Sequence, residues 1–152
     1  PVLFEEYSLH EGSGGAGEHR GGFGVNYTIR LRRGDARASM VMDHGRTGPL
    51  GALGGADGGV NKVRIERGAT SYVPPHLSKD QDIEMQPGDR ICVSTPGGGG
   101  FGDPFNRDPR RVAQDVARGY YTTAQAEGLF GVILGADGSV DSKRTGELRK
   151  RR

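Results

Sequence analysis

The chain has 152 residues, of which 33% are hydrophobic, 28 are Gly and none is Trp, and its formal net charge is only +2. This length allows one domain, and the small hydrophobic fraction predicts either a chain of short strands and tight connections or a piece of something larger, of which we favour the second. The composition excludes a membrane-spanning helix, because no stretch approaches the ~20 consecutive apolar residues that such a helix needs.

Positive charge is concentrated in residues 143–152, KRTGELRKRR. Such a tail is typical of a solvated chain end. Nucleic-acid binding is the alternative, but no aromatic residues stand beside the tail to stack on bases, and no nucleic-acid-binding motif is present. We therefore expect neither nucleic acid nor a membrane among the partners.

Cys92 is the single cysteine and stands in an apolar alternation, which favours a small buried side chain over a nucleophile. A lone cysteine can form neither an internal disulfide nor, by itself, a zinc site. The N-terminal segment has no signal-type apolar run, so the location predicted is a reducing cytoplasm. Pro1 stands where an initiator Met would be, and we expect processing or cleavage to have set this end.

Alternation of apolar and polar side chains predicts β-structure in the first two thirds of the chain. Residues 24–32 have an apolar side chain at every second position, which is the pattern of a half-buried strand. The turn residues that follow predict 36–43 as the next antiparallel strand, paired with 24–32. The predicted fold is mainly β, with antiparallel strands in a barrel- or sandwich-like arrangement. The predicted strands are 3–9, 24–32, 36–43, 61–68 and two short strands within 82–95.

Three Gly-rich connections, residues 11–24, 44–59 and 95–104, separate these strands. They also contain apolar residues such as Leu50 and Phe101, which a flexible linker would lack. We expect extended, polyproline-like backbone packed at close range, where a Cβ would not fit. The glycines to which this argument applies most directly are Gly97, Gly98, Gly99, Gly100 and Gly102.

The same glycines satisfy the G-x-G-x-x-G pattern of dinucleotide-binding loops. That fingerprint needs a helix that opens directly from the loop, so that its first amides meet the pyrophosphate. Here residues 103–109, DPFNRDP, intervene before the next predicted helix. We therefore expect this chain to bind no nucleotide by itself.

The last third of the chain predicts helices. Residues 108–120 have Asp108 as N-cap, Pro109 in the first turn and Gly119 at the C-terminal cap. Residues 122–130 predict a second helix, capped by Thr122 or Thr123.

A final strand and turn over 131–141 and an exposed end over 142–152 complete the prediction. The expected organisation is one structural unit with a Gly-rich β region, residues 1–104, and a helical C-terminal extension with a basic tail, residues 105–152.

Polar groups in two Gly-rich loops are the candidate site residues. Asp43, His44 and Arg46 cluster where a strand enters a loop, and an Asp-His pair can do acid–base work or can simply cap a turn. His19 and Arg20 form a similar polar group in the first loop. The four histidines lie on separate segments without the spacing of metal ligands, so the sequence predicts no metal site in this chain.

The order of the Gly-rich blocks is more specific than any single motif. GSGGAGEHRGGFGV (12–25) is followed by HGRTGPLGALGGADGGVN (44–61) and by MQPGDRICVSTPGGGGFGDPFNRDPRRVAQDVARG (85–119). From about Tyr7 to Thr145, this order resembles the C-terminal region of the hydantoinase B/oxoprolinase family. That family includes B subunits of ATP-dependent N-methylhydantoinases, the equivalent half of 5-oxoprolinase, and large subunits of acetone and acetophenone carboxylases.

The resemblance implies a role in an ATP-dependent complex. In the family, a hydantoinase A-type chain with an actin/hexokinase-like fold holds ATP and Mg and phosphorylates a carbonyl or amide oxygen. The B-type half then takes the activated intermediate to hydrolysis or carboxylation. B-type subunits are several times longer than this chain, and the resemblance places any divalent metal in the part not represented here. The chain is therefore expected to need a larger B-type chain and an A-type ATPase chain, and to be inactive alone.

Two other functions remain open on the sequence. The chain could be a non-catalytic structural module of such a complex, in which no residue approaches the substrate. It could also be a basic nucleic-acid binder, in which case its binding would weaken with salt and depend on residues 143–152.

Overall fold

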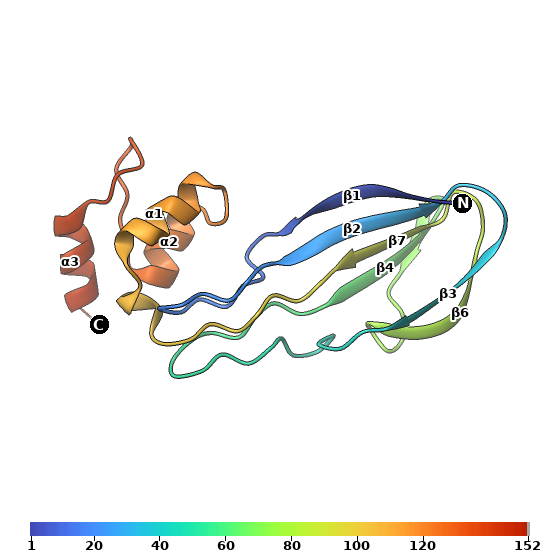
Figure 1. Ribbon diagram of the computed structural model, residues 1–152, viewed down its shortest axis with the longest axis horizontal. Helices are drawn as coiled ribbons and strands as arrows, with labels where there is room; N and C mark the ends of the chain where they lie inside the picture. Colours follow the sequence, from blue (N-terminus) through green and yellow to red (C-terminus); the bar gives the residue numbers. More distant parts are fainter. Residues whose placement is uncertain (152) are drawn as a thin grey trace.

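A computed structural model describes residues 1–151 as an elongated molecule (Figure 1). Strands form one end and helices form the other, with extended Gly-rich segments running between them. The mainly β fold with a short helical C-terminal part is confirmed. The strands are β1 (Val2–His10), β2 (Gly24–Leu31), β3 (Ala36–Val41), β4 (Lys62–Arg67), β5 (Thr70–Tyr72), β6 (Lys79–Met85) and β7 (Arg90–Ser94).

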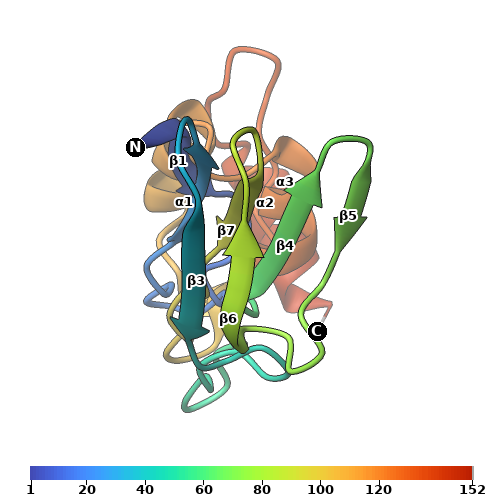
Figure 2. The same cartoon turned by 90° about the vertical axis from the view of Figure 1, so that its right-hand side faces the viewer.

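The strands form two antiparallel sheets that face each other (Figure 2). The larger sheet has the order β1-β2-β7-β4-β5, and the smaller one pairs β3 with β6. Apolar side chains from both sheets form the core between them, so the arrangement is sandwich-like and not a closed barrel. The buried members of this core are Leu31, Met40, Val63, Ile65, Ile83, Met85 and Val93.

The predicted pairing of 24–32 with 36–43 is wrong. β2 pairs with β1 and β7, whereas β3 crosses to the smaller sheet and pairs with β6. The chain makes the return crossing between β6 and β7, and the two corners are bonded to each other. Leu31 N donates to Asp89 O at 3.0 Å and Gly88 N donates to Leu31 O at 2.8 Å. The chain therefore passes from one sheet to the other at both corners. This crossing lets β3 and β6 bury their apolar faces against the larger sheet.

The helical part is built on local capping signals that agree with the prediction. Its elements are the 3₁₀ helix η1 (Pro104–Asn106), α1 (Pro109–Ala117), α2 (Thr123–Phe130) and α3 (Ser142–Lys150). Asp108 caps α1 by accepting from Arg110 N at 2.9 Å, and Gly119 follows its end with a φ of 74°. A second core lies among these helices. Its buried members are Ala16, Val112, Tyr121, Ala126, Phe130 and Val132.

Thr122, and not Thr123, caps α2. Its Oγ1 accepts from Gln125 N at 3.2 Å, and its own N–H donates to Gln125 Oε1 at 2.8 Å, which completes a capping box. We expect Thr122→Ala to lower the free energy of unfolding by about 1 kcal/mol, because one helix donor loses its partner. Urea unfolding of Thr122→Ala beside Thr123→Ala measures this difference. An equal or larger loss in Thr123→Ala would contradict the assignment.

Two expectations for the C-terminal residues are wrong. Residues 131–141 form a turn in place of the expected strand. A single bridge between Leu134 and Val140 closes this turn, which occupies most of the segment and leaves too few residues for a strand. The expected exposed end forms the helix α3 up to Lys150. Asp141 caps this helix by accepting from Arg144 N at 2.9 Å, and the buried hydroxyl of Thr145 accepts from Ile133 N at 3.0 Å.

The Gly-rich segments pack backbone against backbone. Each of the three segments is hydrogen-bonded to the other two. Ala56 N donates to Ala16 O at 2.7 Å. Gly98 O accepts from Gly15 N at 2.9 Å, and Gly100 N donates to Ala56 O at 2.8 Å. At many of these glycines an added Cβ would come within 3.0 Å of a backbone atom of another segment or of the same connection. They include Gly15, Gly21, Gly48, Gly51, Gly55, Gly58, Gly97, Gly99 and Gly100.

Gly98 and Gly102 differ from their neighbours. A Cβ on Gly98 would lie 3.4 Å from its nearest atom, Gly22 N, which is ordinary contact distance. Gly102 has a φ of 74° and would place a Cβ 3.1 Å from Glu18 Cβ. The argument from close packing thus does not extend to Gly98. At Gly102 the positive φ is already sufficient to favour glycine, whatever the space around it.

No helix within residues 1–151 is both long enough and apolar enough to cross a membrane.

Candidate functional site

Asp43, His44 and Arg46 lie on the loop that leaves β3, opposite the segment that enters β6. Hydrogen bonds at both ends hold this loop. Ser78 Oγ donates to Met42 O at 2.9 Å, and Asn61 N donates to His44 O at 2.8 Å. The backbone of the loop is thus fixed while its three predicted side chains remain exposed.

The loop contains unusual backbone conformations. His44 has a φ of 62°, and Leu77 on the facing segment has a φ of 61°. Between them, a Cβ on Gly45 would lie 3.0 Å from Leu77 Cβ. Left-handed conformations of residues other than glycine cost free energy and cluster at functional sites. Of the four residues other than glycine that have a positive φ within residues 1–151, two therefore lie at this site.

The hydrogen bond of His44 fixes its tautomer. Its Nδ1 lies 3.1 Å from Thr47 O. Because a carbonyl oxygen can only accept, Nδ1 must carry a proton and donate it. In the neutral ring, Nε2 then has a free lone pair and can act as a base or accept a hydrogen bond from a ligand.

Asp43 is engaged with a lysine and not with the adjacent histidine. Lys79 Nζ lies 2.7 Å from Asp43 Oδ1, and this hydrogen bond lowers the pKa of the Asp43 carboxyl from its ordinary value. The carboxylate is thus ionised at neutral pH. The Asp-His dyad suggested by the sequence is replaced by an Asp43–Lys79 ion pair, and the adjacent His44 ring is bonded to Thr47 O instead.

Residues 42–46 and 76–79 line a cavity of about 190 Å³. A larger cavity of about 520 Å³ shares Gly45 and Leu77 with it and extends to Cys92 and Arg64. The exposed side chains around the smaller cavity include two histidines, Arg46 and Lys79, against one carboxylate. Such a set suits a ligand with a negatively charged group and can hold or release a proton at His44.

Cys92 is half-buried and does not belong to the hydrophobic core, contrary to expectation. The register places it opposite Thr28 and Arg64, and it alternates with the buried Val93. A hydrogen bond with Cys92 raises the pKa of Arg64. The apolar alternation was read correctly as a strand, but this residue faces away from the core.

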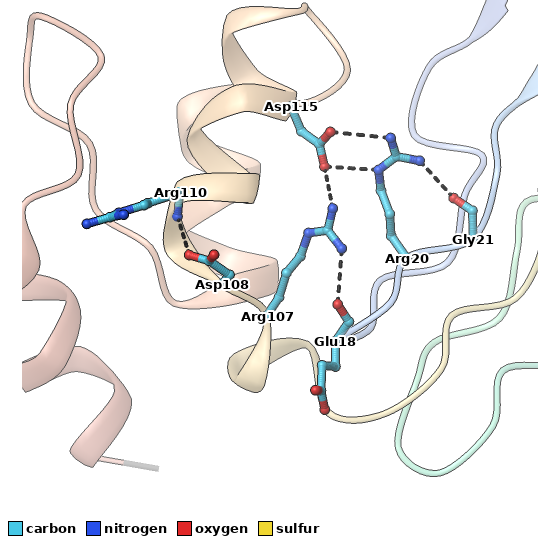
Figure 3. A network of polar contacts seen from close by, with 7 residues as sticks. All are labelled: Glu18, Arg20, Gly21, Arg107, Asp108, Arg110 and Asp115. Carbon is cyan, nitrogen blue, oxygen red and sulfur yellow. Dashed lines mark hydrogen bonds and ion pairs between the residues drawn. The ribbon is translucent and has the colours of Figure 1, made fainter.

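Arg20 is held in a network of ion pairs at the helical end (Figure 3). Its Nε lies 2.9 Å from Asp115 Oδ2, and Arg107 Nη2 reaches the same oxygen at 2.9 Å. The hydrogen bond to Asp115 raises the pKa of Arg20. The Arg20 guanidinium also lies over the Phe23 ring at 4.7 Å. Its donors and its flat face are thus occupied within the chain.

The network continues into the backbone. Arg107 Nη1 donates to Glu18 O at 3.0 Å, and Arg149 Nη2 donates to Arg107 O at 2.8 Å. Asp115 is only 4% exposed and Arg107 only 7%. The buried carboxylate of Asp115 therefore joins α1 to Arg20 of the first Gly-rich segment and to Arg107, whose carbonyl oxygen in turn binds Arg149 of α3.

His19 stays exposed beside Phe101, with ring centroids 6.2 Å apart and backbone hydrogen bonds between the two residues. The structure thus separates the two predicted groups. Asp43, His44 and Arg46 share the cavity at β6, whereas His19 and Arg20 contact Phe101 and Asp115.

Sequence reasoning missed several partners of these residues. His76 and Lys79 come to the site only through the β3–β6 pairing, which no local pattern predicts. Asp115 was not among the predicted site residues. The signal that could have found Asp115 is its spacing from Val112. The two residues are three positions apart, so they lie on the same, buried face of the helix. Within the described residues 1–151, no three His, Cys, Asp or Glu side chains gather as metal ligands.

Comparisons with known proteins agree with this architecture. The family described as hydantoinase B/oxoprolinase matches residues 1–104. Caprolactamase subunit beta of Pseudomonas jessenii is 33% identical over an alignment of 152 positions, which covers 95% of this chain and 25% of that one. The 5-oxoprolinase of Saccharomyces cerevisiae is 41% identical over 102 residues, 67% of this chain and 8% of that protein.

A solved structure shares the fold. The crystal structure of the ATP-dependent caprolactamase from Pseudomonas jessenii matches with a TM-score of 0.78 and 29% identity, over 99% of this chain and 26% of that one. The chain thus spans about a quarter of the length of the caprolactamase subunit that it matches. On the family match to residues 1–104 and these similarities, this chain belongs to the hydantoinase B/oxoprolinase family.

Proposed function

We propose that this chain forms the Gly-rich β module of a B-type subunit in an ATP-dependent complex that opens cyclic amides. The observation that carries the proposal is the match to caprolactamase subunit beta over 95% of the chain. Since that relative is about four times longer, the proposal includes two partners: the rest of a B-type subunit and an A-type ATPase chain.

The proposed reaction divides between these partners. ATP, held with Mg²⁺ by the A-type chain, would transfer its terminal phosphoryl group to the amide oxygen and leave as ADP. The B-type half would add water to that intermediate, which releases inorganic phosphate and the ring-opened amino acid. Where a family member uses a divalent metal, we place the metal in the rest of the B-type subunit and not in this chain.

Within this chain, we assign the loop at β3 to the activated intermediate. Arg46 and Lys79 supply positive charge beside the cavity, which a phosphorylated intermediate would need. His44 supplies a free Nε2 that can take a proton from water or return one to the leaving nitrogen. Asp43 holds Lys79 in place through its 2.7 Å contact.

His44→Asn tests the proton-transfer role. Asparagine tolerates the left-handed backbone that His44 adopts, so the loop should keep its conformation while the imidazole is lost. We expect kcat of the complete complex to fall about 100-fold, because general acid–base catalysis contributes at least that much. His76→Asn, in the facing segment, is the matched control and should change kcat far less.

A non-catalytic structural module is the second candidate function. The backbone packing of the Gly-rich segments and the buried Asp115 network favour it, because both serve rigidity. In that case His44→Asn and Arg46→Ala leave the activity of the assembled complex unchanged.

Reconstitution tests the proposed function as a whole. The rest of the B-type subunit and the A-type chain are combined with and without this chain, and ADP release is measured with caprolactam, 5-oxoproline and hydantoin. The proposal predicts amide-dependent ATP hydrolysis only when all three parts are present. Full turnover without this chain would refute it.

A further inference from the structure

The outer strand β1 carries an apolar row that the rest of the chain leaves uncovered. Val2, Phe4, Tyr7 and Leu9 are 54%, 57%, 72% and 46% exposed. β1 lies at the edge of the larger sheet and has one strand neighbour, β2 (Figure 1). A contiguous apolar row on an open sheet edge marks an interaction surface, since it would otherwise promote aggregation.

A β-bulge keeps the row on one face. Phe4 lies opposite Ile29 and Tyr7 opposite Tyr27, with the register shift between Phe4 and Glu6. In a regular strand, Phe4 and Tyr7 would point to opposite faces, because they are three residues apart and side chains alternate along a strand. The bulge at Glu5 brings them to the same face. The bulge thus aligns two apolar pairs that the sequence places out of phase.

That face is the one that carries the core. Val2 lies opposite the buried Leu31, and the Phe4 ring lies 6.2 Å from the Tyr27 ring, which packs against the core. The smaller sheet has only two strands and covers β2, β7 and β4, whose side chains share the core with it. No residue of β1 is among the buried core members of the described chain.

Glu5, which occupies the bulge, is already paired within the chain. Its carboxylate lies 2.9 Å from Arg30 Nε and 2.6 Å from Arg90 Nε. The hydrogen bond from Arg90, together with the charges of Arg30 and Arg90, lowers the pKa of Glu5. The part of β1 that lacks a partner within the described chain is therefore its apolar row, since the charge of Glu5 is already paired.

We propose that the rest of the B-type subunit packs against the row Val2, Phe4, Tyr7 and Leu9 and covers the open edge of β1. This inference rests on the proposed function. The argument for this occupant is length. In the ATP-dependent caprolactamase, the same fold makes up 26% of one chain, so nearly three quarters of that polypeptide lies outside the module. A second copy of this chain has no such support.

The first experiment measures binding to a defined probe. The probe is the polypeptide segment homologous to the remaining three quarters of caprolactamase subunit beta, from the same organism as this chain. We expect Phe4→Ser/Tyr7→Ser to raise the Kd for this probe at least 100-fold. Val41→Ser, which changes an 87% exposed apolar residue on β3, is the matched control and should leave Kd within 3-fold.

A fold control and a second readout accompany the variants. Because Phe4 and Tyr7 are mostly exposed in the isolated chain and the Phe4 ring contacts Tyr27, its thermal unfolding midpoint should fall only slightly in the double variant. Hydroxyl-radical labelling of the unmodified protein needs no variant. Tyr7 should be labelled at least 5-fold less in the intact B-type subunit than in the isolated chain, while the buried Tyr121 stays protected in both.

The outcomes are distinguishable. Unchanged Kd in the double variant, or equal labelling of Tyr7 with and without the probe, overturns the inference while leaving the proposed function standing. Absence of binding by the wild-type chain refutes the proposed function and the inference with it. A dimer of the isolated chain that the double variant abolishes makes a second copy the occupant and also overturns the inference.

Discussion

Gly99→Ala is expected to prevent folding of the Gly-rich bundle. A Cβ at this position would come within 3.0 Å of Leu50 O and Gly51 N, which belong to the backbone of another segment. Neither atom can rotate away as a side-chain end could, so the two segments must separate. We expect the free energy of unfolding to fall by at least about 3 kcal/mol, the upper range for overpacked sites. Urea unfolding followed by circular dichroism measures the loss.

Gly98→Ala is the matched control for this variant. Its Cβ would lie 3.4 Å from Gly22 N, so the change should cost less than about 1 kcal/mol. Two adjacent glycines with the same sequence context should therefore differ by several kcal/mol. Equal stability of the two variants would show that the segments are loosely packed and that the bundle described here is not rigid.

Asp115→Asn is the second substitution with a large expected effect. The Asp115 carboxylate is the shared partner of Arg20 and Arg107, and it is only 4% exposed. Removing its charge leaves two largely buried guanidinium groups without compensation. Because breaking a buried ion pair costs about 3–5 kcal/mol, we expect a loss in that range.

The readout should locate this loss at the helical end. Hydrogen exchange of α1 and α3 should accelerate in Asp115→Asn, whereas the amides of β2 and β7 in the first core should change far less. Gln114→Ala, at the exposed neighbouring position on α1, is the control and should stay within about 0.5 kcal/mol of wild type. Wild-type stability in Asp115→Asn would show that the network does not hold the helices.

The sequence predicted those features that depend on neighbouring residues. Alternation located the strands, and Asp108 and Thr122 located two helix starts, because a cap acts within one turn. Strand pairing was not predictable in the same way. Residues 33–35 look like a hairpin turn, but the chain changes sheets there, since the apolar faces of β3 and β6 have to cover the larger sheet.

The helix α3 and the partners of the candidate site residues were missed for a related reason. Residues 142–150 are mostly polar, and the contacts that hold them, through Thr145 and Arg149, come from residues far along the chain. Lys79 likewise reaches Asp43 only after β6 pairs with β3. The loop at Asp43–Arg46 could be selected as polar and Gly-rich, but its partners could not.

Native mass spectrometry of the purified assembly, followed by the denaturing mass of each component, tests the central claim most directly. The account predicts that this sequence is found in one complex with the remaining B-type sequence and an A-type ATPase chain. It also predicts that the Phe4→Ser/Tyr7→Ser variant is missing from that complex, whose mass is then lower by the mass of this chain. A folded chain that runs alone at its own mass, with no B-type or ATPase component under any salt condition, would contradict it.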